Sequence, residues 1–251
     1  MEKYTFREHF RELKKRFFKL FGMFIIAFGL CYWFSDNIYR IILSPLVEIT
    51  GDNSRKIIYT GLTEAFFSYI KISAFAAVIL IFPFCCYQLY AFIRPGLHRE
   101  ERKIIAGVLS LSPLLFYIGC FFMFYLVMPN AWLFFISYEK VDVGVPLVLE
   151  ARISEYLSLV IQLTLAFGLS FQLPIVMIVL SSIGLISTES LKRKRRIAIV
   201  IIFVVAAILT PPDVFSQIAL AIPLLLLYEF SILLCKLLEK KSLKNVRYKM
   251  D

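Results

Sequence analysis

The sequence predicts an all-α integral membrane protein with six transmembrane helices, both termini in the cytoplasm, and two short C-terminal helices. The first observation behind this prediction is composition, since 60% of the 251 residues are hydrophobic and 18% are charged. Soluble domains average about 45–50% apolar and about 25% charged residues. The second is that the apolar residues form runs long enough for a hydrocarbon core of about 30 Å. The third is an uneven distribution of lysine and arginine between the loops.

Six apolar runs define the predicted helices. They cover about residues 17–35, 65–93, 104–128, 153–183, 197–209 and 216–235. Residues 1–236 are therefore expected to form one membrane domain, and residues 237–251 a basic cytoplasmic tail. The first run is too long for the apolar region of a signal peptide and has no A-x-A cleavage site, so we interpret it as a retained helix. Prolines inside the runs predict kinks, which membrane helices tolerate; they are Pro83, Pro113, Pro174 and Pro223.

The fifth run is short. Residues 197–209 would extend about 20 Å as a helix, against a hydrocarbon core of about 30 Å. The sequence Thr210-Pro211-Pro212-Asp213 follows at once and cannot continue a helix. Two alternatives stay open: the bilayer thins or water enters beside the last two helices, or the flanking lysines and arginines reach the interface.

Basic residues predict the orientation of the chain. The two terminal segments and the two loops on their side hold 21 of the lysines and arginines, and the three loops on the other side hold five. Because cytoplasmic loops carry the excess of positive charge, both termini are expected in the cytoplasm. The net charge of +10 is thereby explained by topology, and no nucleic-acid partner is expected.

No motif in the sequence indicates catalysis. The chain has no nucleophile elbow, no H-E-x-x-H and no Walker A sequence, and its five cysteines lack metal-binding spacing. We therefore expect no enzymatic activity, no cofactor and no metal.

Acidic residues within the basic segments are the remaining candidates for function. Phe6, Phe10, Leu13 and Phe17 share one helical face, which predicts an amphipathic helix on the cytoplasmic leaflet, with Glu12 beside that face. A second group of acidic residues lies in the next cytoplasmic loop. The alternative reading is that these carboxylates form ordinary ion pairs along their own helices, as Glu12 could with Arg16.

Six stretches resemble, in order, the motifs of the TatC family. They are EHFRELKKR (Glu8–Arg16), TEAFFSYIK (Thr63–Lys71), YAFIRPGLHREER (Tyr90–Arg102), LFYIG (Leu115–Gly119), AFGLSFQLP (Ala166–Pro174) and TPPDVFSQIALAIP (Thr210–Pro223). The resemblance extends from about residue 5 to about residue 236. It departs from the family pattern at Lys14, where the family has arginine, and at Gln172, where the family frequently has an acid.

The resemblance implies a function and a set of partners. It implies that the chain is the receptor and core subunit of the twin-arginine translocase, located in the cytoplasmic (inner) membrane of a bacterium. Such a subunit binds the twin-arginine signal peptides of folded precursors and nucleates a translocation complex driven by the proton-motive force. The implied partners are small single-span subunits of the TatA and TatB type and further copies of this chain, within membrane lipid.

The resemblance also implies roles for individual residues. It assigns signal-peptide binding to Glu12, Glu101 and Phe92, and a structural or gating role to Pro45, Pro83 and Asp213. Gln172 and Glu229 are the polar residues expected within the membrane, where ionisable and amide groups need partners. Two other functions remain open on the sequence: a secondary transporter with a polar site at the midplane, and an insertase or scaffold that does not contact substrate.

Overall fold

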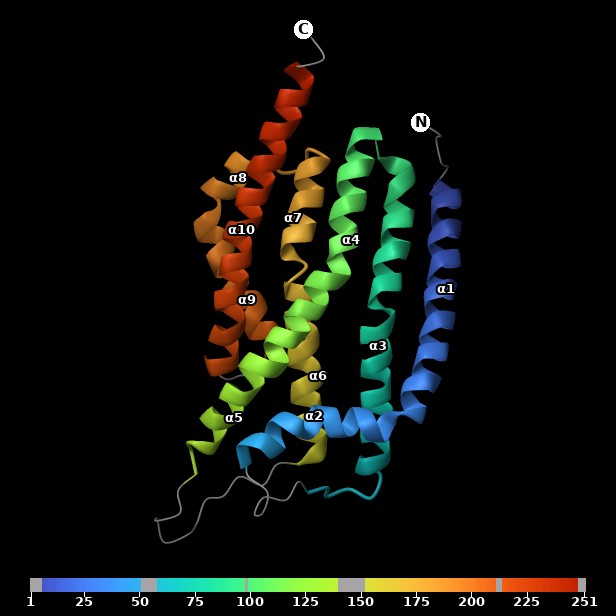
Figure 1. Ribbon diagram of the computed structural model, residues 1–251, viewed down its shortest axis with the longest axis vertical. Helices are drawn as coiled ribbons and strands as arrows, with labels where there is room; N and C mark the ends of the chain where they lie inside the picture. Colours follow the sequence, from blue (N-terminus) through green and yellow to red (C-terminus); the bar gives the residue numbers. More distant parts are fainter. Residues whose placement is uncertain (1–5, 51–57, 98, 140–151, 211–213, 248–251) are drawn as a thin grey trace.

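The computed structural model describes residues 6–50, 58–97, 99–139, 152–210 and 214–247, which form an up-and-down bundle of helices (Figure 1). The helices are α1 (Phe6–Trp33), α2 (Ser35–Thr50), α3 (Glu64–Ile93), α4 (Arg99–Phe122), α5 (Met128–Ile136), α6 (Ile153–Ser170), α7 (Leu173–Ser182), α8 (Thr188–Arg193), α9 (Arg195–Leu209) and α10 (Val214–Arg247). Helix α1 begins and α10 ends at the same end of the bundle, which we call the terminal end.

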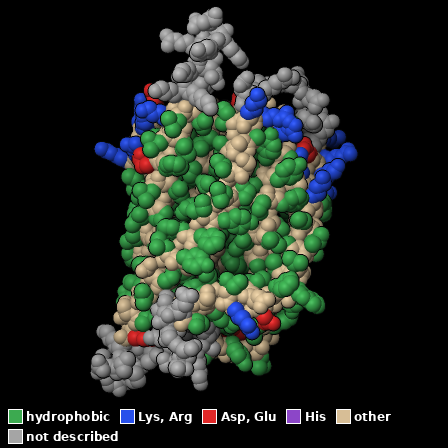
Figure 2. Space-filling view, viewed as in Figure 1, with side chains coloured by type: hydrophobic (Ala, Val, Ile, Leu, Met, Phe, Trp, Pro, Cys, Tyr) green, Lys and Arg blue, Asp and Glu red, His purple; other side chains and the backbone are tan. Residues whose placement is uncertain are grey.

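Within the described residues, six helical segments run along the bundle, as predicted: α1, α3, α4 with α5, α6 with α7, α9, and α10. Five of them are long and apolar enough to cross a membrane, and α9 is the exception with 15 residues. Hydrophobic side chains cover the middle of the molecule, and most of the lysines and arginines visible in Figure 2 lie at the terminal end. The all-α class with six membrane segments is therefore confirmed.

The first helix differs from its prediction. The stretch from Phe6 to Phe17 was expected to form an amphipathic helix on the cytoplasmic leaflet, and the membrane helix was expected over residues 17–35; in the structure both belong to one continuous helix that ends at Trp33. The reason is that residues 6–33 contain no proline, so every residue of this stretch can donate its backbone N–H to a helical hydrogen bond.

Helix α2 was not predicted, and it lies across the end of the bundle opposite the terminal end (Figure 1). It buries Ile42 and Leu46 in the main core, while Ile41 and Val47 are exposed. Pro45 is buried inside this helix and has no N–H for the carbonyl of Ile41, but the Ser44 hydroxyl donates to that oxygen at 2.8 Å. The Ser44 hydroxyl thus replaces the donor that Pro45 lacks. Pro45 lies at the end of the bundle opposite the terminal end.

Two other prolines change the predicted helix bounds. The run predicted as one helix over residues 153–183 divides into α6 and α7, with a turn at Phe171–Gln172 just before Pro174. The run predicted to end at residue 128 instead continues to Ile136, through a π-helical turn over Met123–Val127 that precedes Pro129. Both changes occur where a proline cannot donate to the carbonyl four residues earlier.

The C-terminal pair is short in one member only. Helix α9 has 15 residues, as expected for a short helix, but α10 has 34 and takes in most of the stretch predicted as a separate tail. No glycine or proline follows Pro223, and the sequence after Cys235 is rich in lysine and leucine, which favour helix.

The Glu64 carboxylate connects two helices at the opposite end of the bundle. The Glu64 carboxylate, whose side chain is 9% exposed, accepts backbone N–H groups from Thr60 at 2.8 Å, Gly61 at 3.1 Å and Ser154 at 3.2 Å. Arg152 donates to the Thr60 hydroxyl at 2.6 Å. These contacts join the start of α3 to the start of α6, which are about 90 residues apart in sequence.

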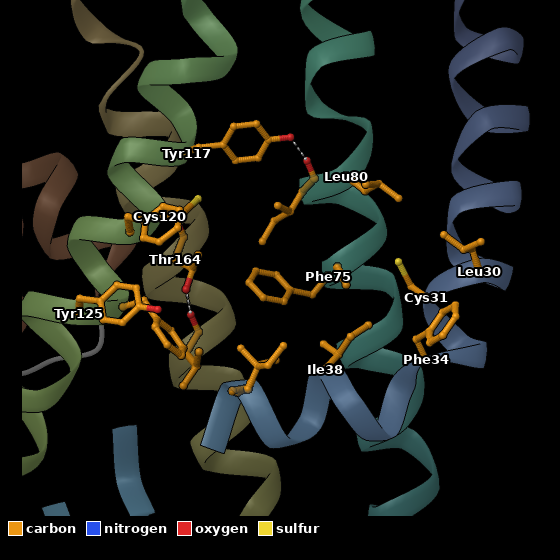
Figure 3. A pocket seen from close by; sticks show the side chains of 17 residues that line it. Leu30, Cys31, Phe34, Ile38, Phe75, Leu80, Tyr117, Cys120, Tyr125 and Thr164 are labelled. Carbon is orange, nitrogen blue, oxygen red and sulfur yellow. Dashed lines mark hydrogen bonds between the residues drawn. The ribbon is translucent and has the colours of Figure 1, made fainter. Parts of the chain in front are cut away.

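Pro83 leaves the carbonyl of Ile79 without its helical donor, and α4 supplies a substitute. The Tyr117 hydroxyl donates to the Ile79 oxygen at 3.1 Å, reaching from α4 to α3 (Figure 3). Helix α3 consequently runs through Pro83 without a break.

Replacing Tyr117 with phenylalanine should lower the free energy of unfolding by about 0.5–1.5 kcal/mol, because the Ile79 carbonyl then lacks any donor in an apolar setting. The effect should shrink when Pro83→Ala restores the helical N–H, so a double-mutant cycle on thermal stability in detergent measures the coupling. If Tyr117→Phe lowers thermal stability equally in the wild-type chain and in the Pro83→Ala variant, the hydroxyl does not replace the donor that Pro83 lacks.

Candidate functional site

Three of the predicted site residues lie at the terminal end of the bundle. Glu12 is in the second turn of α1, Phe92 is in the last turn of α3, and Glu101 is in the first turn of α4. Helix α1 packs along α3, and a single 3-10 turn over Arg94–Gly96 connects α3 toward α4. All three helix ends therefore lie at one end of the molecule (Figure 1), as the predicted binding site requires.

Glu12 is held by an arginine of its own helix. The Arg16 guanidinium donates to Glu12 Oε1 through Nη2 at 2.5 Å and through Nε at 3.1 Å. The same guanidinium reaches α3, where Nη1 donates to Gln88 Oε1 and Nη2 to the Ala91 carbonyl, both at 3.0 Å. The side chains of Arg16 and Glu12 are 21% and 27% exposed. The Glu12 carboxylate is thus oriented by a guanidinium that α3 fixes in place.

An apolar groove of about 570 Å³ begins beside this network and runs between α1, α3, α4, α6 and α7. Arg16, Gln88 and Phe92 line one part of the groove, and Gln172 lines another. Leucine, isoleucine, valine and phenylalanine side chains form most of the remaining wall. The groove gives the terminal end a concave apolar surface next to a polar cluster.

Gln172 makes both types of hydrogen bond that an amide can make. Its Oε1 accepts from the Ser112 hydroxyl, and its Nε2 donates to the Ser112 backbone carbonyl at 3.0 Å. Cys86 lies 3.3 Å from the same hydroxyl. Gln172 therefore links the turn between α6 and α7 to α4. A polar residue within the membrane was expected to need a partner, and Ser112 is that partner.

The other predicted residues lie outside this region. Glu229 in α10 forms an ion pair with Arg195 at the start of α9, at 2.7 Å, and both side chains are about half exposed. Pro45 is in α2 at the opposite end, and Pro83 is in the middle of α3. Asp213 lies outside the described residues. The predicted residues that the structure describes are thus spread over the bundle, and of these Glu12, Glu101 and Phe92 lie at the helix ends of the terminal end.

A second cavity, of about 590 Å³, lies toward the opposite end between α1, α2, α3, α4 and α6 (Figure 3). None of the predicted site residues lines it. Its hydroxyls from Tyr117 and Thr164 already donate to the carbonyls of Ile79 and Val160. The cavity offers an apolar surface and no charged group, so it is not a site for recognising a charged ligand.

Sequence reasoning missed the connection between α1 and α3. It recognised the four-residue spacing of Glu12 and Arg16 as a possible ion pair, but Gln88 received no role. The available signal was a glutamine within an otherwise apolar run, since a buried amide needs partners. Among the described residues, no group of three His, Cys, Asp or Glu side chains could hold a metal ion.

Comparisons with known proteins agree on one family. The family model described as Sec-independent protein translocase protein (TatC) matches residues 8–223. A Sec-independent protein translocase protein TatC of Rickettsia prowazekii (strain Madrid E) is 58% identical over 251 residues, which cover all of both chains. The protein of that name from Escherichia coli (strain K12) is 38% identical over 224 residues, covering 89% of this chain and 85% of the relative.

Solved structures give the same result for the fold. A crystal structure described as twin arginine translocase receptor TatC, in DDM, matches with a TM-score of 0.78 and 36% sequence identity. The match covers 90% of this chain and 99% of that one. Because the family model covers most of the chain and the relatives match it nearly end to end, this multi-pass membrane protein belongs to the TatC family of Sec-independent protein translocase proteins.

Proposed function

We propose that this chain is the receptor and core subunit of a twin-arginine translocase, binding the signal peptides of folded precursors at Glu12, Glu101 and Phe92. The observation that carries the proposal is the oriented Glu12 carboxylate beside an apolar groove, at the end of the bundle where α3 ends and α4 begins. A peptide with paired arginines followed by an apolar stretch matches both features.

The chemistry of the two carboxylates suits guanidinium groups. A carboxylate accepts a guanidinium through two parallel N–H···O bonds, whereas an ammonium acts as a point charge without that geometry. Glu12 and Glu101 can each take one arginine of the pair. The ring of Phe92, which lines the groove next to Arg16 and Gln88, can contact the arginine face or the first apolar residues after it.

The groove provides a place for the apolar part of the signal peptide. Its volume of about 570 Å³ is within the range of pockets that bury most of a small ligand. Its lining is almost entirely apolar, so an apolar segment would remove both surfaces from water and lipid headgroups. A charged residue in that segment would meet no partner along most of the wall.

We propose that the terminal end faces the cytoplasm in the inner membrane of a bacterium. The excess of lysine and arginine in the segments at this end supports the orientation, since positive loops stay inside. Precursors fold in the cytoplasm, so a receptor must present its carboxylates there. Small single-span subunits of the TatA and TatB type and further copies of this chain are the proposed partners in a complex driven by the proton-motive force, on the basis of family membership.

The orientation predicts a labelling pattern. Cysteines introduced at Asn53 and Gly144 should react with an impermeant thiol reagent in intact cells, and one at Ser242 should react only after the cells are opened. The unmodified chain, with its five native cysteines, sets the background. Labelling of Ser242→Cys in intact cells would reverse the assignment.

Co-purification with a precursor tests the function directly. The detergent-purified full chain should retain a folded precursor whose signal peptide carries Arg-Arg, and should lose it when that pair becomes Lys-Lys. A transporter of small solutes or a scaffold without substrate contact predicts that neither precursor is retained. Equal retention of both precursors would show an interaction that does not depend on the arginines, contrary to the proposal.

A further inference from the structure

We infer that Arg16 is a positioning residue that makes the signal-peptide site selective for arginine over lysine. The inference rests on the proposed function and adds a residue for which neither motif nor resemblance gave a role in binding. Its basis is the contact between Arg16 and three acceptors on two helices: Glu12 on α1, and Gln88 with the Ala91 carbonyl on α3.

The described hydrogen bonds from Arg16 use one oxygen of the Glu12 carboxylate, and the proposal places the incoming guanidinium at the other. Both described bonds from Arg16 go to Oε1, so Oε2 is not used by this arginine. Because Nη1 and Nη2 are also bonded to α3, Arg16 cannot follow Glu12 if the carboxylate rotates. The carboxylate plane is therefore defined relative to two helices before any peptide binds.

A fixed carboxylate plane favours arginine in particular. Arg16 already donates two N–H groups to Oε1, so an incoming guanidinium meets Oε2, where two of its N–H groups can converge on one oxygen as those of Arg16 do on Oε1. A carboxylate that rotates freely loses part of that directed contact. An ammonium has three N–H donors on a rotatable bond and can donate to an oxygen from many directions, so its binding depends little on how the carboxylate is oriented. The positive charge of Arg16 also lowers the attraction of the site for any cation that relies on charge alone. Both effects increase the preference for arginine.

The test compares two peptides on the purified full chain. The probes are a synthetic twin-arginine signal peptide and the same peptide with Lys-Lys, and the measured quantity is the ratio of their dissociation constants. Arg16→Gln should reduce the preference for arginine by about fivefold or more, since it removes both the fixed orientation and the charge. Gln88→Leu keeps the charge and removes one anchor, and should reduce the preference by about two- to threefold.

Two further variants separate selectivity from folding and from simple charge loss. Arg11→Gln removes the same charge from an exposed position on the same helix and should leave the ratio unchanged. Arg16→Lys, which keeps the charge without the fork, should give a ratio between those of wild type and Arg16→Gln. If Arg16→Gln does not fold, the ratio for Gln88→Leu decides the question.

The outcomes distinguish this inference from the function on which it rests. Equal weakening of both peptides in Arg16→Gln and Gln88→Leu, with the ratio unchanged, would mean that Arg16 only joins two helices. That result, together with loss of arginine-peptide binding in Glu12→Gln, overturns the inference and leaves the proposed function standing. Undiminished binding in Glu12→Gln overturns the inference and removes Glu12 from the site, and retention of the Arg-Arg precursor against the Lys-Lys precursor then decides the proposed function.

Discussion

Replacing Glu12 or Glu101 with glutamine should weaken binding of a twin-arginine peptide by about ten- to a hundredfold. Each substitution removes the charge of one carboxylate while keeping its shape, and one charge-assisted hydrogen-bonded contact contributes about 1.5–3 kcal/mol. Isothermal titration or fluorescence anisotropy with the purified chain in detergent measures the change. The double variant should lose detectable binding, because neither arginine then has an anionic partner.

The control for this pair is Glu155→Gln. Glu155 is 70% exposed and pairs with Arg152 at the start of α6, far along the bundle from the terminal end, so its loss should leave peptide affinity unchanged. In Glu12→Gln the Arg16 contacts to α3 should still join the helices, so thermal stability measured alongside affinity separates loss of binding from loss of folding. Full peptide affinity in both single variants would remove Glu12 and Glu101 from the site.

Adding a methyl group at Gly119 should produce the largest loss of stability. A Cβ there would lie 2.7 Å from the Phe167 carbonyl oxygen and 3.1 Å from the Gly168 Cα, both of which are backbone atoms of α6. Helices α4 and α6 must separate to admit it, which typically costs about 1–3 kcal/mol and more for a larger side chain. Gly119→Val should therefore be less stable than Gly119→Ala, and both should unfold at lower temperatures than wild type.

Gly168 gives the matching test from the other helix. A Cβ at Gly168 would lie 2.6 Å from the Phe116 ring, which is 1% exposed and stacks on Phe82 with ring centroids 3.6 Å apart, so the ring has little room to move. Gly107, in the same helix as Gly119, has nothing within 4 Å of its Cβ position. Gly107→Ala should be neutral or slightly stabilising. Equal thermal stabilities for Gly107→Ala and Gly119→Ala would contradict the close approach of α4 and α6.

Part of the candidate site was available from the sequence. Glu12 and Glu101 stand out as acids within basic segments, and the motifs around them resemble those of one family. Their common location at the terminal end followed from counting helices between them. The Arg16 contact to Gln88, 72 residues away, did not follow, because spacing along one helix predicts neighbours only on that helix. The partner of Gln172, Ser112, is 60 residues away and was equally hidden.

The sequence by itself determined the class of the protein, its six membrane segments and the uneven distribution of charge between its two ends. These are local properties: a run of apolar residues must cross lipid as a helix wherever it lies in the bundle, since lipid cannot satisfy backbone polar groups. Only the tertiary structure decided that the run through Pro174 divides, that Tyr117 serves the carbonyl freed by Pro83, and that Arg16 orients Glu12 from an anchor on α3. Each of these depends on a group that helix packing brings close. The periodicity of a sequence shows which face of a helix is apolar, but it does not show which other helix that face contacts.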